Sequence, residues 1–166
     1  MAVFPVRFFG DPVLREKSEP VEELDGKIRV LSGNMAETMY KARGVGLAAP
    51  QIGVLKQVIV IDMGDDEFVA YINPLIIESS RSKDTEEEGC LCLPDIRVPV
   101  TRHKRVVVEA LDLQGRPVTV EADEMLARIL QHEIDHLDGK TILDTTDRKS
   151  REAALREFMS ALAEEV

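Results

Sequence analysis

Apolar residues near the start of the chain recur with the period of an amphipathic helix. Spacings of three and four residues place their side chains on one helical face, which we expect to pack against the core. The pattern predicts a helix over residues 28–41. A shorter helix is predicted over residues 13–17, because the residue before Pro20 disfavours the helical conformation and ends it. The residues of the apolar stripe are Ile28, Leu31, Met35 and Met39.

The middle of the chain consists of short apolar runs separated by turn-forming residues, a pattern typical of β-strands. Between these runs, the glycine-rich residues 44–53 are predicted to form a tightly packed loop. The charged residues 81–88 are predicted to form a solvated loop. The predicted strands cover residues 58–62, 68–72, 75–79, 98–100, 105–113 and 118–122.

Two helices are predicted in the last third of the chain. The first covers residues 124–138 and ends at Gly139, in the position that glycine favours after a helix. The second covers residues 147–164. Because the strands cluster in the middle instead of alternating with helices, we expect an α+β fold. Antiparallel or mixed sheets would pack around the first of these helices, the second would be a C-terminal amphipathic helix, and residues 1–166 would form one domain. The apolar face of the last helix consists of Leu155, Phe158, Met159 and Leu162.

The composition is typical of a soluble globular protein, with 44% hydrophobic and 31% charged residues. A net charge of −10 repels nucleic acid, so we expect no DNA partner. No apolar run approaches the roughly 20 residues needed to cross a bilayer. Arg7 interrupts the apolar start, which has no signal-peptide cleavage pattern. We therefore expect a cytoplasmic protein without a membrane partner.

The strongest chemical signal is the segment HEIDH at residues 132–136. In a helix, His132 and His136 lie one turn apart on the same face and can share one divalent ion. Glu133 lies about 100° around the helix, where it can move a proton without taking a ligand position. A helix with two surface histidines is the alternative, but the chain has only three histidines in all. The segment therefore predicts a metal-dependent hydrolytic site.

The two cysteines of the chain, Cys90 and Cys92, are the candidates for a third ligand. Catalytic zinc-type sites use three protein ligands and leave one position open for water. We predict Cys90 as the third ligand, since a thiolate binds such ions strongly. Side chains two apart in an extended segment share a face, so a closed structural site with both cysteines is the rival interpretation. Glu133 argues against it, because a closed site has no use for a neighbouring carboxylate.

Three segments together resemble the signature motifs of the peptide deformylase family. They are GVGLAAPQ at residues 44–51, EGCL at residues 88–91 and QHEIDH at residues 131–136. They occur in the family's order and at similar separations, and the opening GDPVLR at residues 10–15 also fits. The resemblance covers essentially the whole chain, and the three motifs together are far more specific than HExxH alone.

The resemblance implies removal of the N-formyl group from the first methionine of newly made bacterial polypeptides. Glu133 would be the general acid and base, while the Gln51 side chain and the Leu91 backbone N–H would stabilise the oxyanion. The metal ion would be Fe²⁺, with Zn²⁺, Ni²⁺ or Co²⁺ able to occupy the site. N-formyl-methionyl nascent peptides would be the partners. The implied metal ligands are Cys90, His132 and His136.

The substrate pocket is expected beside the metal. On the central helix, Met125 and Ile129 lie on the same face as His132, and Arg128 lies partly on that face. The rival interpretation of Met125 and Ile129 is an ordinary place in the core. Arg97 is expected either to pair with Glu88 or to hold the substrate main chain. The expected substrate contacts are Val45, Gly46, Gly89, Arg97, Met125, Arg128 and Ile129.

Two features depart from a simple picture. The family pattern generally has serine where this chain has Cys92, and we expect Cys92 to be buried and not to bind the metal. The last helix begins with Arg148, Lys149 and Arg151 and closes with Glu164, which opposes the helix dipole. The helix is either frayed and solvated, or it makes a transient contact with the ribosome, as it does in some relatives. Two rival functions remain open: a zincin endopeptidase, and a non-catalytic module stabilised by a metal.

Overall fold

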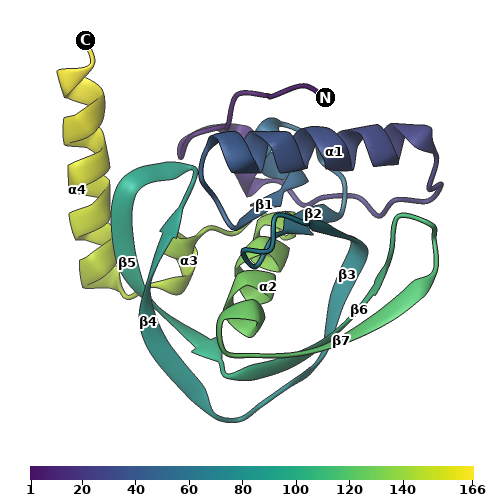
Figure 1. Cartoon of the computed structure of the whole chain (residues 1–166). Coiled ribbons are helices and arrows are strands. Elements are labelled where there is room, and N and C mark those ends of the chain that lie inside the picture. The colour runs from purple at the N-terminus through teal and green to yellow at the C-terminus, as the bar shows by residue number, and fades with distance from the viewer.

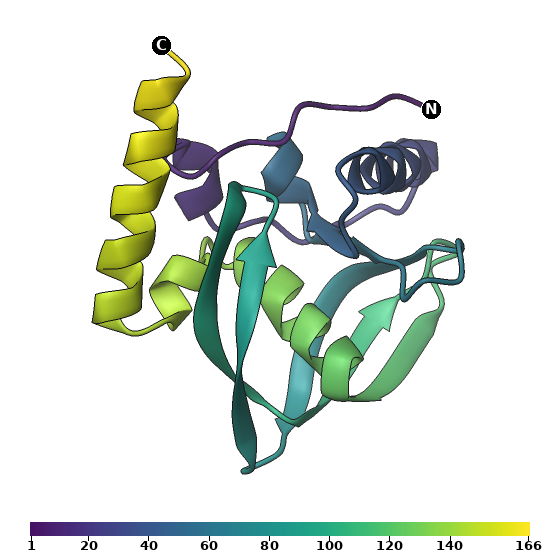
Figure 2. The same ribbon diagram turned by 60° about the vertical axis from the view of Figure 1, so that its left-hand side comes forward.

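The computed structural model describes all 166 residues. Its strands form two antiparallel sheets, one of five strands in the order β1-β2-β3-β6-β7 and one of two strands, β4 and β5 (Figure 1). Helix α2 lies between the two sheets, which is clearest in Figure 2. The strands are β1 (Gly46–Ala48), β2 (Val58–Ile61), β3 (Val69–Ser79), β4 (Lys83–Cys90), β5 (Leu93–His103), β6 (Arg105–Leu111) and β7 (Pro117–Asp123). The helices are α1 (Gly26–Lys41), α2 (Glu124–Leu137), α3 (Ile142–Thr145) and α4 (Arg148–Glu164), with 3₁₀ turns η1 (Pro12–Arg15) and η2 (Ala49–Ile52).

Helix α2 is the centre of the molecule, as its sequence pattern predicted. Leu130 and Ala127 are fully buried and pack in one cluster with Ile59 of β2 and Val108 of β6. Gly139 follows the helix with φ +75, the left-handed conformation in which a side chain is strained. The helix therefore begins and ends close to where the sequence predicted. The α+β fold with antiparallel sheets around the HExxH helix is confirmed.

Helix α1 packs against β1 and β2, the first two strands of the five-stranded sheet. Met35 and Met39 are fully buried and lie in one cluster with Leu47 and Val58. The phenol oxygen of Tyr40 donates a hydrogen bond of 2.6 Å to Asp62 at the end of β2. The predicted helix over residues 28–41 is thus confirmed, with a start two residues earlier.

The predicted loop at residues 44–53 is wrong in its secondary structure. Its residues form β1, which pairs with β2, and then the turn η2. Leu47, Ala48 and Ala49 are fully buried. A three-residue strand has too little sequence to show a period, and its stability comes from a pairing partner far along the chain.

The predicted loop at residues 81–88 is also wrong, because the charged run is strand β4. Every residue of it pairs with β5. Glu86 and Glu87 face solvent, while Glu88 is buried. One strand, β3, likewise replaces the two predicted around Asn73-Pro74. Asn73 adopts φ +51 at an irregularity in the pairing of β3 with β6, so the missing N–H of Pro74 breaks no regular ladder.

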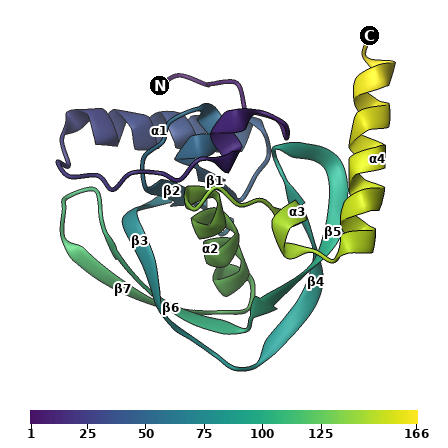
Figure 3. The ribbon, with the colours of Figure 1, turned by 180° about the vertical axis from the view of Figure 1, so that it is seen from behind.

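Helix α4 is anchored through only part of its predicted apolar face. Phe158 is buried and meets Phe9 edge to face, with ring centroids 5.9 Å apart. Met159 is 63% exposed and Leu162 is 41% exposed, so the second half of the predicted stripe is not covered. Seen from behind, α3, which the sequence did not predict, links α2 to α4 (Figure 3). No helix combines the length and apolar character needed to cross a bilayer.

Candidate metal centre

Three side chains from two elements converge on one point. His132 and His136 lie on α2, and their rings meet edge to face with centroids 5.2 Å apart. Cys90 ends β4, and its Sγ lies 3.3 Å from Nε2 of His136. The ligand atoms of the three residues all lie within 4.8 Å of one another. The structure therefore brings together the three metal ligands that the sequence predicted.

The donors fit a divalent transition metal. Nδ1 of His132 is hydrogen-bonded to Oε1 of Glu88 at 2.8 Å, which leaves Nε2 for a metal. Nε2 of His136 faces the Cys90 sulfur. One thiolate and two imidazoles suit Zn²⁺ and Fe²⁺, and three protein ligands leave a position open for water. The three residues are therefore a group that can hold one metal ion.

Cys92 lies against the centre but outside the three-residue group. Its side chain is fully buried, as expected, and its Sγ lies 3.0 Å from the Sγ of Cys90. The hydrogen bond with Cys92 and burial together raise the pKa of Cys90 to about 11. For His132, burial lowers the pKa, but hydrogen bonds with Cys90 and Glu88 outweigh it and hold the pKa well above its usual value.

Glu133 is buried beside the ligands, and its Oε2 has no partner within the chain. Its side chain is 4% exposed, and Oε2 makes no hydrogen bond. Burial raises its pKa to about 7. Gly46 makes room for it, because a Cβ at Gly46 would lie 2.7 Å from Glu133 Oε1. Gly46, predicted as a substrate contact, thus also borders the carboxylate.

Gln51 is fixed with its amide nitrogen toward the sulfur. Its Oε1 accepts a hydrogen bond of 2.8 Å from the backbone N–H of Ala48, and Nε2 lies 3.6 Å from Cys90 Sγ. The backbone N–H of Arg7 donates to the Gln51 carbonyl at 2.7 Å, which ties the N-terminal segment to this turn. Leu91 lies in the tight turn between β4 and β5. Both residues therefore border the Cys90 side of the centre.

A buried ionic network supports His132, and the sequence showed only part of it. Glu88 pairs with Arg102 through two hydrogen bonds of 3.0 Å, and not with Arg97. Burial alone would raise the pKa of Glu88, but hydrogen bonds from His132 and Arg102 lower it to about 2. Arg102 also binds Asp135. Arg102 could have been found from strand alternation. It lies two residues after Val100 and four after Val98, and all three side chains point to the buried face of β5.

The expected substrate contacts divide into exposed and buried side chains. Val45 is 53% exposed and Met125 is 54% exposed, whereas Ile129 and Arg128 are buried. Arg97 lies near Gly89 and donates to the carbonyl of Glu87 at 2.8 Å. Ile129 belongs to the core cluster around α2. The structure thus supports the rival core interpretation for Ile129 and leaves Met125 at the surface.

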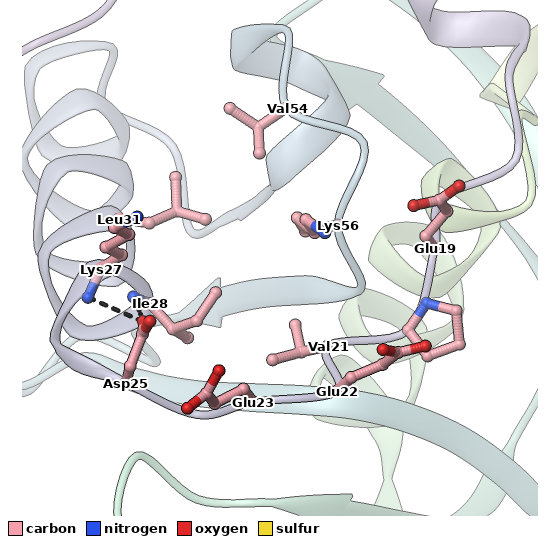
Figure 4. Close-up of a pocket in the computed structure, with 11 residues that line it drawn as sticks. Glu19, Val21, Glu22, Glu23, Asp25, Lys27, Ile28, Leu31, Val54 and Lys56 are labelled. Atoms are coloured by element: carbon pink, nitrogen blue, oxygen red, sulfur yellow. Dashed lines mark hydrogen bonds between the residues drawn. The ribbon is translucent and has the colours of Figure 1, made fainter.

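One pocket of the structure lies away from the metal centre. It measures about 710 Å³ and is enclosed by the segment at residues 19–25, the start of α1, and the chain after η2 (Figure 4). None of the ligands or expected substrate contacts lines it. The close-up shows carboxylates and two lysines around apolar side chains, with Asp25 bonded to the start of α1. The metal centre is therefore a separate feature.

Comparison with known protein families shows to which family the chain belongs. The family model described as polypeptide deformylase matches residues 3–152. The chain belongs to the polypeptide deformylase family. A peptide deformylase of Natranaerobius thermophilus is 47% identical over 152 residues, which cover 92% of this chain and 97% of that one. One of Acetivibrio thermocellus is 51% identical over 148 residues, which cover 89% and 86% of the two chains.

Solved structures of peptide deformylases share the fold. The enzyme of Legionella pneumophila superposes with a TM-score of 0.93 at 38% identity, covering 99% of this chain and 98% of that one. The enzyme of Synechococcus elongatus, solved with actinonin, gives 0.90 at 38% identity and covers 93% and 86%. The family predicted from the three motifs is therefore confirmed.

Proposed function

We propose that this deformylase-family chain performs its reaction at the centre formed by Cys90, His132 and His136. Membership of the family makes the chain a metal-dependent hydrolase that removes the N-formyl group from newly made peptides. One observation carries the assignment of residues. Three ligand atoms converge within 4.8 Å beside a buried carboxyl, that of Glu133, which has one oxygen without a partner.

The metal proposed for the native protein is Fe²⁺, with Zn²⁺, Ni²⁺ or Co²⁺ able to replace it. The soft thiolate and the two imidazoles accept each of these ions. When bound, the ion supplies Lewis acidity, which activates water and polarises a carbonyl oxygen. Glu88 keeps His132 in the tautomer that a ligand needs.

Glu133 is proposed to carry the proton of the reaction. Its carboxylate, whose Oε2 has no partner within the chain, can accept the proton that the attacking water loses. As the bond between the formyl carbon and the peptide nitrogen breaks, Glu133 returns that proton to the departing amine. The formic acid formed gives its remaining acidic proton to the amine, so the products are formate and a peptide with a protonated amino terminus.

Gln51 and Leu91 are proposed to stabilise the negative oxygen of the tetrahedral intermediate. The Gln51 amide oxygen accepts from the Ala48 N–H, and its nitrogen donates to Cys90 Sγ at 3.6 Å, which leaves a second N–H of the amide as the proposed oxyanion donor. The Leu91 backbone N–H lies in the neighbouring turn. Donors that are already in place are typically worth about 10²–10³ in rate each.

The substrate is proposed to enter between the β4–β5 hairpin and the exposed end of α2. Val45 and Met125 offer exposed apolar surface for the methionine side chain. Gly46 and Gly89 are proposed to contact the substrate backbone, and Arg97 borders Gly89. Ile129 packs in the core cluster around α2 and is not part of the proposed pocket. The Arg128 guanidinium, by contrast, is already hydrogen-bonded to other residues of this chain.

The partners proposed for the chain are N-formyl-methionyl nascent peptides in the bacterial cytoplasm. A transient ribosome contact through α4 is a further proposal, supported by its basic start and its uncovered Met159. Arg151 is already bound to the Leu143 carbonyl at 2.8 Å, so Arg148 and Lys149 are the residues to change. Co-sedimentation with ribosomes that survives reversal of both charges would remove this proposal.

Formate release tests the function. Protein purified without oxygen is given formyl-Met-Ala-Ser, the acetylated equivalent, and a longer peptide with a free amino terminus. We expect formate from the formylated peptide alone and no internal cleavage. New internal amino termini would indicate the endopeptidase. A folded, metal-containing protein that cleaves nothing would indicate the closed structural site with both cysteines.

A further inference from the structure

We infer that Arg128 is a positioning residue of the metal centre, which holds Glu88 in the orientation in which Glu88 holds His132. The inference rests on the proposed function, because it concerns the same centre. The sequence suggested a substrate contact for Arg128. Its side chain is only 7% exposed, and its guanidinium faces the β4–β5 hairpin.

Glu88 is saturated by donors from three directions. Its Oε1 accepts from Nδ1 of His132 at 2.8 Å and from Nη2 of Arg102 at 3.0 Å. Its Oε2 accepts from Nε of Arg102 at 3.0 Å and from Nη1 of Arg128 at 2.6 Å. Each oxygen thus has two donors, which is the ordinary capacity of a carboxylate. Arg128 makes the shorter of the two contacts to Oε2.

Arg128 is itself held from several sides. Nη1 also donates to the Val100 carbonyl of β5 at 2.9 Å. Nη2 donates to the side chain of Asp84 at 2.9 Å and to its carbonyl at 3.2 Å. Nε lies 3.6 Å from a carboxyl oxygen of Glu86. The planar guanidinium therefore spans both strands of the hairpin, which a lysine ammonium cannot do.

The place of Arg128 on α2 gives this contact its effect on the metal. Arg128 lies four residues before His132, so both side chains lie on one face of the helix. Both end on the same carboxylate of Glu88, which belongs to the hairpin that also carries Cys90. Arg128 therefore ties the helix with two ligands to the strand with the third.

Loss of Arg128 leaves Glu88 Oε2 with one donor and removes the cation that faces Asp84 and Glu86. Repulsion among the three carboxylates then favours movement of Glu88 away from its present position. His132 loses the fixed acceptor that sets its tautomer and ring orientation. Disruption of such supporting contacts typically weakens metal affinity about 10-fold to 100-fold.

The test measures metal release without substrate, so its failure is distinct from failure of the proposed function. Protein loaded with Zn²⁺ is mixed with a chromogenic chelator, and the rate of Zn²⁺ transfer is followed. We expect Arg128→Met to release Zn²⁺ about 10-fold to 100-fold faster than wild type. Arg128→Lys keeps the charge and should be intermediate. Arg116→Met, which breaks an exposed pair with Asp112, is the matched control and should release at the wild-type rate.

A double-variant comparison separates positioning from a general structural role. If Arg128 acts through Glu88, adding Arg128→Met to Glu88→Gln should produce no further acceleration of release. Equal acceleration in both backgrounds would overturn the inference, as would release at the wild-type rate from Arg128→Met. Should the methionine variants fail to fold, Arg128→Lys alone and with Glu88→Gln gives the same comparison, and an unchanged rate for the single variant would overturn it.

Discussion

The Sγ atoms of Cys90 and Cys92 lie 3.0 Å apart, yet only Cys90 belongs to the group of three ligands. Both sulfurs are held by the tight turn that joins β4 to β5. The resemblance to the family motifs led us to expect serine at the position of Cys92. Its closeness to a ligand makes its role in metal binding directly testable.

Cys92→Ser should retain one metal ion per chain and most of the activity, because the three ligands stay in place. X-ray absorption of the loaded wild type should give one sulfur neighbour of the metal, and the variant should give the same number. Cys90→Ser is the control and should lose most of the metal. Two sulfur neighbours in the wild type would contradict the account.

Gly46→Ala should reduce activity while leaving metal content unchanged. The new Cβ would lie 2.7 Å from Glu133 Oε1 and 3.1 Å from its Cδ, so the carboxyl must move. A displacement of this kind typically costs about 10²-fold in rate, which we expect in kcat/KM for formate release. Gly26→Ala is the control, since no atom lies within 4 Å of its Cβ position. Equal activity of the two variants would rule out the steric role of Gly46.

Tyr40→Phe should change how stability depends on pH. The hydrogen bond to Asp62 raises the pKa of Tyr40 from 10.0 to about 12. Because this pKa is higher in the folded chain, the bond's contribution is complete below pH 10 and is lost as the pH rises toward 12. Urea unfolding at a series of pH values should show wild type more stable than the variant at pH 8. That difference should shrink above pH 10, and a constant difference would contradict the assignment.

The sequence predicted the features that depend on short spacing. His132 and His136 are four residues apart, so helix geometry alone places them together. The stripe of α1 and the end of α2 at Gly139 follow from equally local signals. Cys90 was found because few other residues could supply a third ligand.

Features that depend on distant partners were missed. Strand β4 looks like a solvated loop because its charges hide its alternation, and it is a strand because β5 pairs with it along its length. Arg128 meets Glu88 across 40 residues of sequence. Such pairings depend on the packing of α2 between the sheets, which no local pattern specifies.

In the proposed reaction, Glu133 moves the proton at a metal centre built by three other residues. The most direct measurement is formate release from formyl-Met-Ala by wild type and Glu133→Gln, both purified without oxygen and shown to contain equal Fe²⁺. The glutamine keeps the shape but cannot accept the proton, so we expect a loss of at least about 10²–10⁴-fold. Comparable rates at equal metal content would contradict the account.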